Sequence, residues 1–269
     1  MDLNIIVCLK WVPNTQAVRI DPKTKTLVRE GVPSIVNPHD LDALELALKL
    51  KDEYGGSVRV VSMAPPSAVL GLEHAIGMGA DEAYLVSDRA FAGADTLATS
   101  YTLYKAIERI GGFDLIMTGQ ETIDSSTAHI AAQLACWFNL PYVYYVEKAV
   151  YRGDGVLRVW RRLEKYVEVY DLKLPAVVSV AMKSNPPRRV SLVNKVRAKV
   201  EKPIKTLSNK ELGLDENCIG LKGSPTRVVK IEVMPEVPRK RQVFKGDARE
   251  AAKWLVKKLV EEGVIEFGE

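Results

Sequence analysis

The 269-residue chain has an ordinary globular composition, with 47% hydrophobic and 27% charged residues, so a large buried core is expected. The net charge of +4 is small for this length and gives no argument for a nucleic-acid partner. Cys8, Cys136 and Cys218 are far apart, and without a CxxC pair they do not predict a zinc or iron–sulfur site. Cys8 and Cys136 lie in apolar runs and are expected to be buried thiols.

The sequence predicts a cytoplasmic protein without direct membrane insertion. No apolar stretch approaches the ~20 residues that a membrane-spanning helix needs. The N-terminus leads directly into a strand-like segment, residues 3–9, with no basic region before it and no small-residue cleavage site after it.

The first half of the chain alternates short apolar runs with amphipathic segments. Strands are expected at residues 5–9, 57–62, 82–86, 115–117 and 143–146, and helices at residues 38–48, 68–78, 96–110 and 126–138. Asn37 or Asp40 is expected to cap the first helix. Repeated strand–helix alternation predicts a parallel sheet covered on both faces, which is the doubly wound α/β class. Such folds bind ligands at the carboxyl ends of their strands, near the switch in strand order.

The second half changes character. Residues 155–180 alternate in the manner of an antiparallel hairpin that leads into a strand at 176–181. Residues 184–245 are polar, basic and punctuated by proline, and are expected to form an extended arm with few core elements. An amphipathic helix is expected at 248–262.

These patterns predict a nucleotide-binding α/β domain at residues 1–183 and a C-terminal arm and helix at residues 184–269. A long segment with little regular structure is unusual inside a compact domain. The arm and helix are therefore expected to pack on a partner subunit, and the alternative is a peripheral extension on the same domain.

Residues 119–127 are the first candidate binding segment, because they lie between an expected strand and an expected helix. Backbone amides at a helix start favour an anion such as a phosphate, and Asp124, Ser126 and Thr127 add polar side chains. Neither GxGxxG nor GxxxxGK[ST] is present. The alternative interpretation is an ordinary helix cap.

Four other loops follow strands or precede helices, namely residues 10–14, 37–38, 62–66 and 92–96. Together they would line one crevice. The histidines are scattered, and neither paired carboxylates nor a triad or metal-ligand pattern is recognisable, so no catalytic residue and no metal site are predicted. His129 could face a ligand. This pattern is typical of a protein whose chemistry belongs to a bound cofactor.

Six segments in order resemble the beta subunits of electron transfer flavoproteins, including FixA-like members. They are residues 7–13, 36–45, 77–81, 95–100, 119–127 and 161–178. The last matches the family signature, a basic–acidic hairpin that ends in Leu-Pro-Ala-Val, although Lys165 and Tyr166 stand where two small residues are usual. The resemblance covers about residues 3 to 205.

The resemblance implies an alpha-subunit partner that carries its own FAD, and an adenine nucleotide in the crevice of this chain. The residues that it assigns to the nucleotide are Leu9, Lys10, Asn37, Met63, Asp95, Thr96, Gly119, Asp124, Ser126 and Thr127. The nucleotide is AMP in the plain branch of the family. It is a second FAD in the electron-bifurcating branch, in which NADH is the donor.

Residues 94–101 look like the bifurcating branch, and FAD is favoured over AMP. Ser125 and Ser126 stand where that branch usually has Gly and Asp. The loss of the acid removes one negative charge beside a phosphate site and is compatible with anion binding.

Residues 188–197 look like the family's docking loop for a partner dehydrogenase. Leu192 would be the apolar anchor, and Arg188, Arg189 and Arg197 would steer an acidic partner. The alternative is a solvated basic arm.

The sequence therefore predicts the beta subunit of a heterodimeric electron transfer flavoprotein. It would pass electrons between NADH or a dehydrogenase and an acceptor such as a quinone oxidoreductase or ferredoxin. The alternative hypothesis is a stand-alone ATP/AMP-binding α/β regulatory module. That module would need a glycine-rich phosphate loop after the fourth strand, where this chain supplies only Gly119.

Overall fold

The computed structural model describes residues 2–14, 19–20, 27–28, 33–201, 203–227, 229 and 241–266. The chain divides into two compact units, residues 1–230 and residues 231–269. The first unit therefore includes residues 184–230, which the sequence patterns assigned to the C-terminal arm. The predicted packing of residues 184–269 on a partner stays a prediction.

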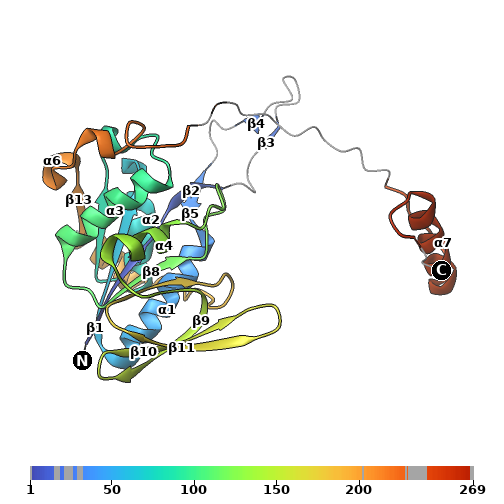
Figure 1. Ribbon diagram of the computed structural model, residues 1–269, viewed down its shortest axis with the longest axis horizontal. Helices are drawn as coiled ribbons and strands as arrows, with labels where there is room; N and C mark the ends of the chain where they lie inside the picture. Colours follow the sequence, from blue (N-terminus) through green and yellow to red (C-terminus); the bar gives the residue numbers. More distant parts are fainter. Residues whose placement is uncertain are drawn as a thin grey trace. The chain divides into compact units, whose positions relative to one another are not determined.

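The first unit is built on a nine-stranded sheet in the order β11-β10-β9-β12-β8-β1-β6-β7-β13 (Figure 1). Its strands are β1 (Leu3–Cys8), β6 (Gly56–Met63), β7 (Glu82–Val86), β8 (Leu115–Gly119), β9 (Tyr142–Gly153), β10 (Val156–Arg162), β11 (Val167–Lys173), β12 (Ala176–Val180) and β13 (Ile204–Leu207). In the spatial order of the sheet, the consecutive strands β9-β12-β8-β1-β6-β7-β13 are all parallel to their neighbours. The pairs β9–β10 and β10–β11 are antiparallel. The predicted doubly wound sheet and its hairpin are confirmed.

Helices cover both faces of this sheet. They are α1 (Pro38–Tyr54), α2 (Val69–Met78), α3 (Thr96–Ile110) and α4 (Ile130–Phe138). Because side chains alternate along a strand, Ile5 and Val7 of β1 pack with α1 and α2, whereas Ile6 packs with α3 and α4. Fully buried aliphatic side chains on both faces explain the continuous apolar runs in the sequence.

Within the described residues, the connections contain three short helical turns and two small ladders. The turns span Pro66–Ala68, Arg89–Phe91 and Glu216–Cys218. The ladders pair β2 (Trp11–Pro13) with β5 (Ser34–Val36) and β3 (Arg19–Ile20) with β4 (Leu27–Val28), both antiparallel. Sequence analysis did not predict these short strands.

Helix α4 begins four residues later than predicted. The amide of Ser126 donates to the carbonyl of Thr122 at 2.8 Å, which closes a turn before the helix. Ser126 and Ala128 then have positive φ angles of 49° and 56°. A right-handed helix cannot include these conformations, so residues 126–129 belong to the loop.

The segment after residue 184 has more regular structure than predicted. It contains α5 (Leu192–Val200), β13 and α6 (Asn209–Leu212). Strand β13 pairs with β7 from Ile204 opposite Ala83 to Leu207 opposite Val86, and so extends the sheet. A four-residue strand at a sheet edge has too short a pattern to be recognised from sequence alone.

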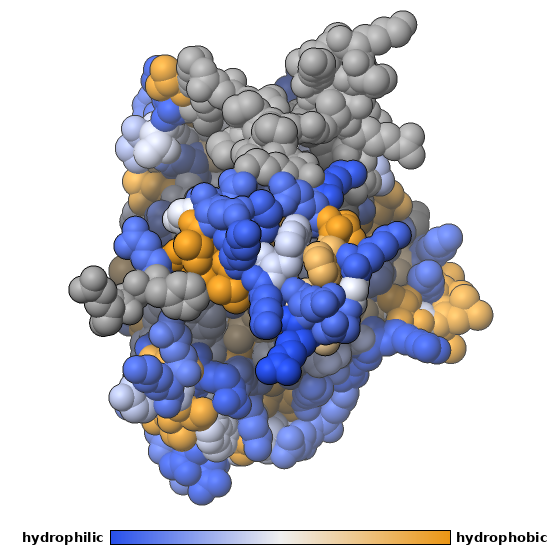
Figure 2. Space-filling view, turned by 90° about the vertical axis from the view of Figure 1, so that its right-hand side faces the viewer, coloured by the Kyte–Doolittle hydropathy of each residue, from blue (hydrophilic) through white to orange (hydrophobic). Residues whose placement is uncertain are grey.

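The cysteine prediction is half right. Cys8 is buried in β1, but Cys136 is exposed because it lies on the outer side of α4, away from Leu134 and Ala135. More generally, the face of the molecule in Figure 2 carries hydrophobic patches among mainly hydrophilic residues. Apolar patches of this kind are common where proteins meet partners.

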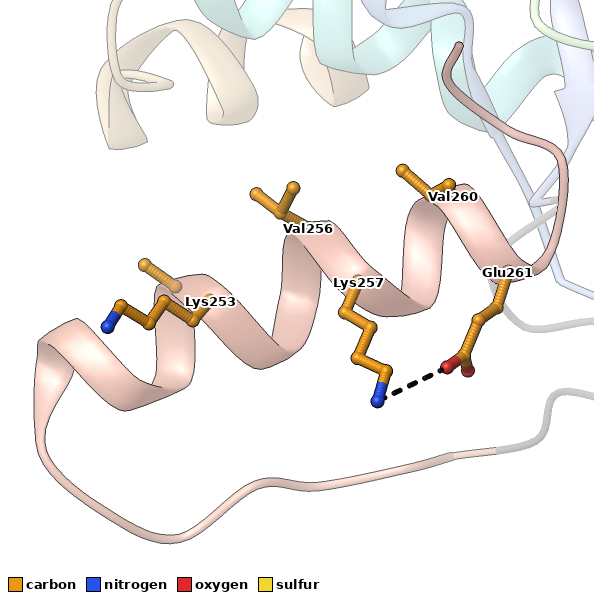
Figure 3. Close-up of a pocket in the computed structure, with 6 residues that line it drawn as sticks. Lys253, Val256, Lys257, Val260 and Glu261 are labelled. Atoms are coloured by element: carbon orange, nitrogen blue, oxygen red, sulfur yellow. Dashed lines mark ion pairs between the residues drawn. The ribbon is translucent and has the colours of Figure 1, made fainter. Parts of the chain in front are cut away.

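The second unit contains α7 (Ala248–Glu261), which confirms the predicted C-terminal helix. Asp247 caps it by accepting the amides of Arg249 and Glu250. The hollow drawn in Figure 3 is lined by Ala252, Lys253, Val256, Lys257, Val260 and Glu261. One helix supplies all of these residues, so the hollow is an open helix face and not an enclosed ligand site.

No helix in the described ranges is long and apolar enough to cross a membrane. The cytoplasmic location stays a prediction.

Candidate functional site

The switch in strand order lies at β1. The chain runs from β1 to β6 and β7 on one side, and then crosses to β8 on the other side of β1. The loops that leave β1 and β8 therefore diverge, and in doubly wound folds this divergence marks the candidate ligand crevice, at the carboxyl ends of the strands. The loop after β1 carries Lys10, and the loop after β8 comprises residues 120–129.

Asn37 holds the second loop from behind. It is fully buried at the start of α1, yet its side chain does not cap that helix. Instead, the side-chain Nδ2 of Asn37 donates to the carbonyl of Glu121 at 2.8 Å, and its Oδ1 accepts the backbone amide of Ile123 at 3.2 Å. Its own backbone amide donates to the carbonyl of Lys10 at 2.9 Å. Asn37 thus joins both loops of the crevice and is a supporting residue.

Asp40 joins the ends of the two strands. Its carboxylate accepts the backbone amides of Lys10 at 2.7 Å and Gly119 at 3.1 Å. Burial raises its pKa to about 7, although the hydrogen bonds from Lys10, Asn37 and Gly119 lower it. Gly119 permits this approach, because a Cβ there would lie 2.5 Å from the carboxylate oxygen.

The Lys10 ammonium reaches across the crevice mouth to Asp124, with Nζ–O distances of 2.7 and 2.9 Å. Burial of the Asp124 side chain opposes ionisation, but the hydrogen bonds from Lys10 and Thr122 outweigh it and lower the pKa of Asp124. Both side chains are partly exposed, so the pair is open to exchange. A phosphate could compete with Asp124 for the ammonium.

Residues 124–127 form the exposed rim of the crevice. The left-handed conformations of Ser126 and Ala128 flank Thr127, and alternating conformations of this kind orient successive amides toward an anion. Non-glycine residues with positive φ are concentrated at functional sites. The Ser126 hydroxyl donates to the carbonyl of Thr122 at 3.3 Å, so the exposed hydroxyl of Thr127 is the additional donor. This chemistry fits the phosphate group of a nucleotide.

The N-terminus of α3 borders the same loop. Thr96 Oγ1 lies 3.4 Å from His129 Nδ1, so two residues from distant parts of the sequence meet there. Asp95 has a different role, because it caps α3 by accepting the amides of Leu97 and Ala98. Its other oxygen accepts the amide and the hydroxyl of Thr226. Asp95 is therefore fully engaged within the chain.

Leu9 directly follows β1, and Met63 is the last residue of β6. Leu9 is 4% exposed and belongs to the hydrophobic core, so only its backbone is close to the crevice. Met63 ends β6 and packs partly buried against the cluster beneath α3 and α4.

The four predicted docking residues divide into two kinds. Arg188 forms ion pairs with Glu45 at 2.9 Å and Asp52 at 2.8 Å, and Arg197 donates to the carbonyls of Ala80 and Asp81. These two arginines anchor the segment to its own domain. The other two residues project outward, since Arg189 is exposed and Leu192 is 76% exposed.

Sequence analysis missed the buried acidic side chains of α1. Asp42 accepts the amides of Lys183 and Asn185 at 2.9 and 3.0 Å, and Glu45 accepts the amide and guanidinium of Arg188. Charged residues are rarely buried unless they are paired. The signal in the sequence was the position of Asp40, Asp42 and Glu45, close to the apolar face of the expected helix.

Within the described residues, no group of three or more His, Cys, Asp or Glu side chains could hold a metal ion. The crevice presents hydroxyls, backbone amides and one ammonium, which are groups suited to an anion.

The fold defines a doubly wound α/β protein with a candidate ligand site at its switch point. An electron transfer flavoprotein domain model matches residues 24–212. The chain is 44% identical to an electron transfer flavoprotein subunit beta of Thermoanaerobacterium thermosaccharolyticum over 98% of this chain and 100% of that protein. The chain therefore belongs to the electron transfer flavoprotein family, among its beta subunits.

Two further relatives are similar over most of their length. Subunit CarD of the caffeyl-CoA reductase-Etf complex of Acetobacterium woodii is 41% identical over 98% of this chain and all of CarD. Protein FixA of Bradyrhizobium diazoefficiens is 40% identical over 93% of this chain and 89% of FixA. Family membership gives the chain an electron transfer role and associates it with flavin in general.

Asn37→Ala is expected to loosen the loop after β8. The substitution removes two hydrogen bonds to buried backbone groups, so we expect the free energy of unfolding to fall by about 2 kcal/mol. Hydrogen exchange should accelerate at residues 121–127. Asn209→Ala is the matched control, because Asn209 bridges the amide and the carbonyl of Leu214 in the same way. Unchanged exchange at 121–127 in the Asn37 variant would contradict the supporting role.

Glu45→Ala is expected to destabilise the protein by about 3 kcal/mol, because it leaves the partly buried Arg188 guanidinium without its main partner. Denaturant unfolding measures this loss. Glu108→Ala breaks the exposed pair with Lys105 and should cost less than about 1 kcal/mol. Equal effects of the two substitutions would show that Arg188 does not depend on Glu45.

Proposed function

We propose that the chain is the beta subunit of a heterodimeric electron transfer flavoprotein and binds an adenine nucleotide in the crevice between β1 and β8. The observation that carries the proposal is the arrangement at the switch point. Lys10, the rim at residues 124–127 and the supporting Asn37 converge from three separate segments. Close similarity to named beta subunits over nearly the whole chain supports it.

In this proposal the described side chains act on the nucleotide's phosphate. Lys10 would exchange Asp124 for phosphate oxygens, and Thr127 would donate a hydrogen bond from the rim. Ser126 would donate as well by turning its hydroxyl away from the carbonyl of Thr122. Thr96 and His129 would border the rest of the ligand, since they meet beside the same loop. FAD, if bound, would supply the electron-carrying chemistry, whereas the chain would bind and orient it. AMP would have a structural role.

We favour FAD over AMP. Residues 94–101 resemble the electron-bifurcating branch, and CarD is named as part of a complex between a reductase and an electron transfer flavoprotein. The chain would then act with an alpha subunit that carries the other FAD. Electrons would pass between NADH or a dehydrogenase and an acceptor such as a quinone oxidoreductase or ferredoxin.

We also propose that α5 presents the docking surface for the partner dehydrogenase. Its apolar side chains Leu192, Val193, Val196 and Val200 are 76%, 77%, 55% and 74% exposed. Ala198 and Val190 pack inward and hold the helix against the domain. Arg188 and Arg197 support this surface from within, and Arg189 lies at its edge.

Ligand release tests the proposed nucleotide. The chain is purified with its alpha subunit and denatured, and FAD and AMP are quantified per heterodimer. Two FAD and no AMP would support the bifurcating branch and a redox-active crevice. One FAD and one AMP would support the plain branch. Neither ligand beyond the alpha-subunit FAD would contradict the nucleotide site and favour a different role, such as a stand-alone regulatory module.

Leu192→Ala is expected to weaken docking without unfolding the protein. The side chain is exposed, so stability should change by no more than about 0.5 kcal/mol. Loss of a central apolar anchor should weaken binding to a purified candidate dehydrogenase by about 30-fold, measured by surface plasmon resonance of the heterodimer. Leu70→Ala on α2 is the control, because Leu70 is similarly exposed at 64%. Equal effects of the two substitutions would place docking elsewhere.

A further inference from the structure

We propose that Asp40 is a positioning residue of the nucleotide site, which sets the separation of the two crevice loops by holding the ends of β1 and β8 together. The inference rests on the proposed nucleotide site. Asp40 is not among the residues that the family resemblance assigns to the ligand.

The geometry places Asp40 behind the crevice. The residue is 5% exposed, and each of its oxygens accepts one backbone amide, from Lys10 at 2.7 Å and from Gly119 at 3.1 Å. Lys10 lies two residues after the end of β1, and Gly119 is the last residue of β8. The carboxylate therefore bridges the switch point itself.

Movement at either amide would be transmitted to the ligand-facing groups. Lys10 carries the ammonium that reaches Asp124, and Gly119 leads directly into the loop that ends in the rim. The lack of a side chain at Gly119 brings its backbone into contact with the start of α1. A close contact of this kind leaves little freedom for the strand end to shift without the loss of a hydrogen bond.

Burial of the Asp40 carboxylate costs free energy, because the charged form loses its contact with water. Desolvation raises the pKa of Asp40 to about 7 despite the opposing hydrogen bonds. A leucine or asparagine at this position would avoid the cost of a buried charge but could not accept both amides. The double acceptor is the property that distinguishes aspartate here.

Asp42 supplies an internal comparison. It lies on the same helix, is 6% exposed, and also accepts two backbone amides, from Lys183 and Asn185. Those amides follow β12 and belong to neither the loop after β1 nor the loop after β8. The two aspartates thus have the same chemistry and burial but hold different segments.

The test compares Asp40→Asn with Asp42→Asn in the full chain, by calorimetric titration with FAD and with AMP. Asparagine keeps one acceptor and turns its other group into a donor, so each variant loses one hydrogen bond. We expect Asp40→Asn to weaken nucleotide binding about tenfold. The two variants should lower the melting temperature by similar amounts, but Asp42→Asn should weaken nucleotide binding less than about threefold.

The pH dependence of nucleotide binding distinguishes a positioning role of Asp40 from an effect on stability alone. Above about pH 7 the Asp40 carboxylate accepts both amides, and below it protonation removes one acceptor, so the affinity of the wild type for FAD should fall as the pH falls through this value. The Asp40→Asn variant should lack this component. FAD is used because the phosphate of AMP itself titrates near pH 6.

Other groups near Asp40 must be separated from this effect. The thiol of Cys8 on β1 has its pKa raised by burial to about 12, so it is not expected to change charge near pH 7. The Lys10 ammonium is paired with Asp124, and both groups are retained in the Asp40→Asn variant. His39 precedes Asp40 on α1, and His129 lies in the loop after β8. Both histidines are retained in the Asp40→Asn variant, so the difference from wild type removes their contribution.

The outcomes are distinct. Equal nucleotide affinity in the wild type and Asp40→Asn, or an equal loss in Asp42→Asn, would overturn the inference alone. If Asp40→Asn fails to fold, a wild-type affinity for FAD that is constant between about pH 6 and about pH 8.5 would overturn it. A wild type that binds neither nucleotide would overturn the proposed function and the inference together.

Discussion

The structure depends on one requirement at the switch in strand order. The backbone amides near the carboxyl ends of β1 and β8 need hydrogen-bond acceptors there. Neighbouring strands pair there only up to their last residues, and the diverging loops leave amides without ladder partners. The carboxylate of Asp40 accepts two of them. The crevice is thus formed by strand order, and the first turn of α1 keeps it at a fixed width.

Helix α1 extends the same solution along its length. Asp40, Asp42 and Glu45 face inward and hold, in turn, the strand ends, the segment after β12 and Arg188. One helix therefore connects the proposed nucleotide site to the base of the proposed docking helix. A helix fixed by buried polar contacts at three points behaves as a rigid element, and such elements are able to carry coupling between distant sites.

Sequence patterns predicted the fold well because each buried strand and amphipathic helix has its own local signal. They also brought together Lys10, Asn37 and residues 119–127, since doubly wound topology places strand ends at one edge. They did not find the contacts that Asp95 and Arg188 make with segments more than 100 positions away. Such contacts depend on the tertiary fold, and no local pattern signals them.

The division of tasks in the crevice bears on the choice between FAD and AMP. In the proposed site, Lys10 and the rim at residues 124–127 would bind a phosphate, which both ligands possess. Discrimination must therefore depend on what surrounds the remainder of the ligand. The meeting of Thr96 and His129 marks one such border, and Asp95 fixes it by capping α3 and binding Thr226. Thr226, in the segment that precedes the C-terminal unit, is thus attached to the start of α3 beside Thr96.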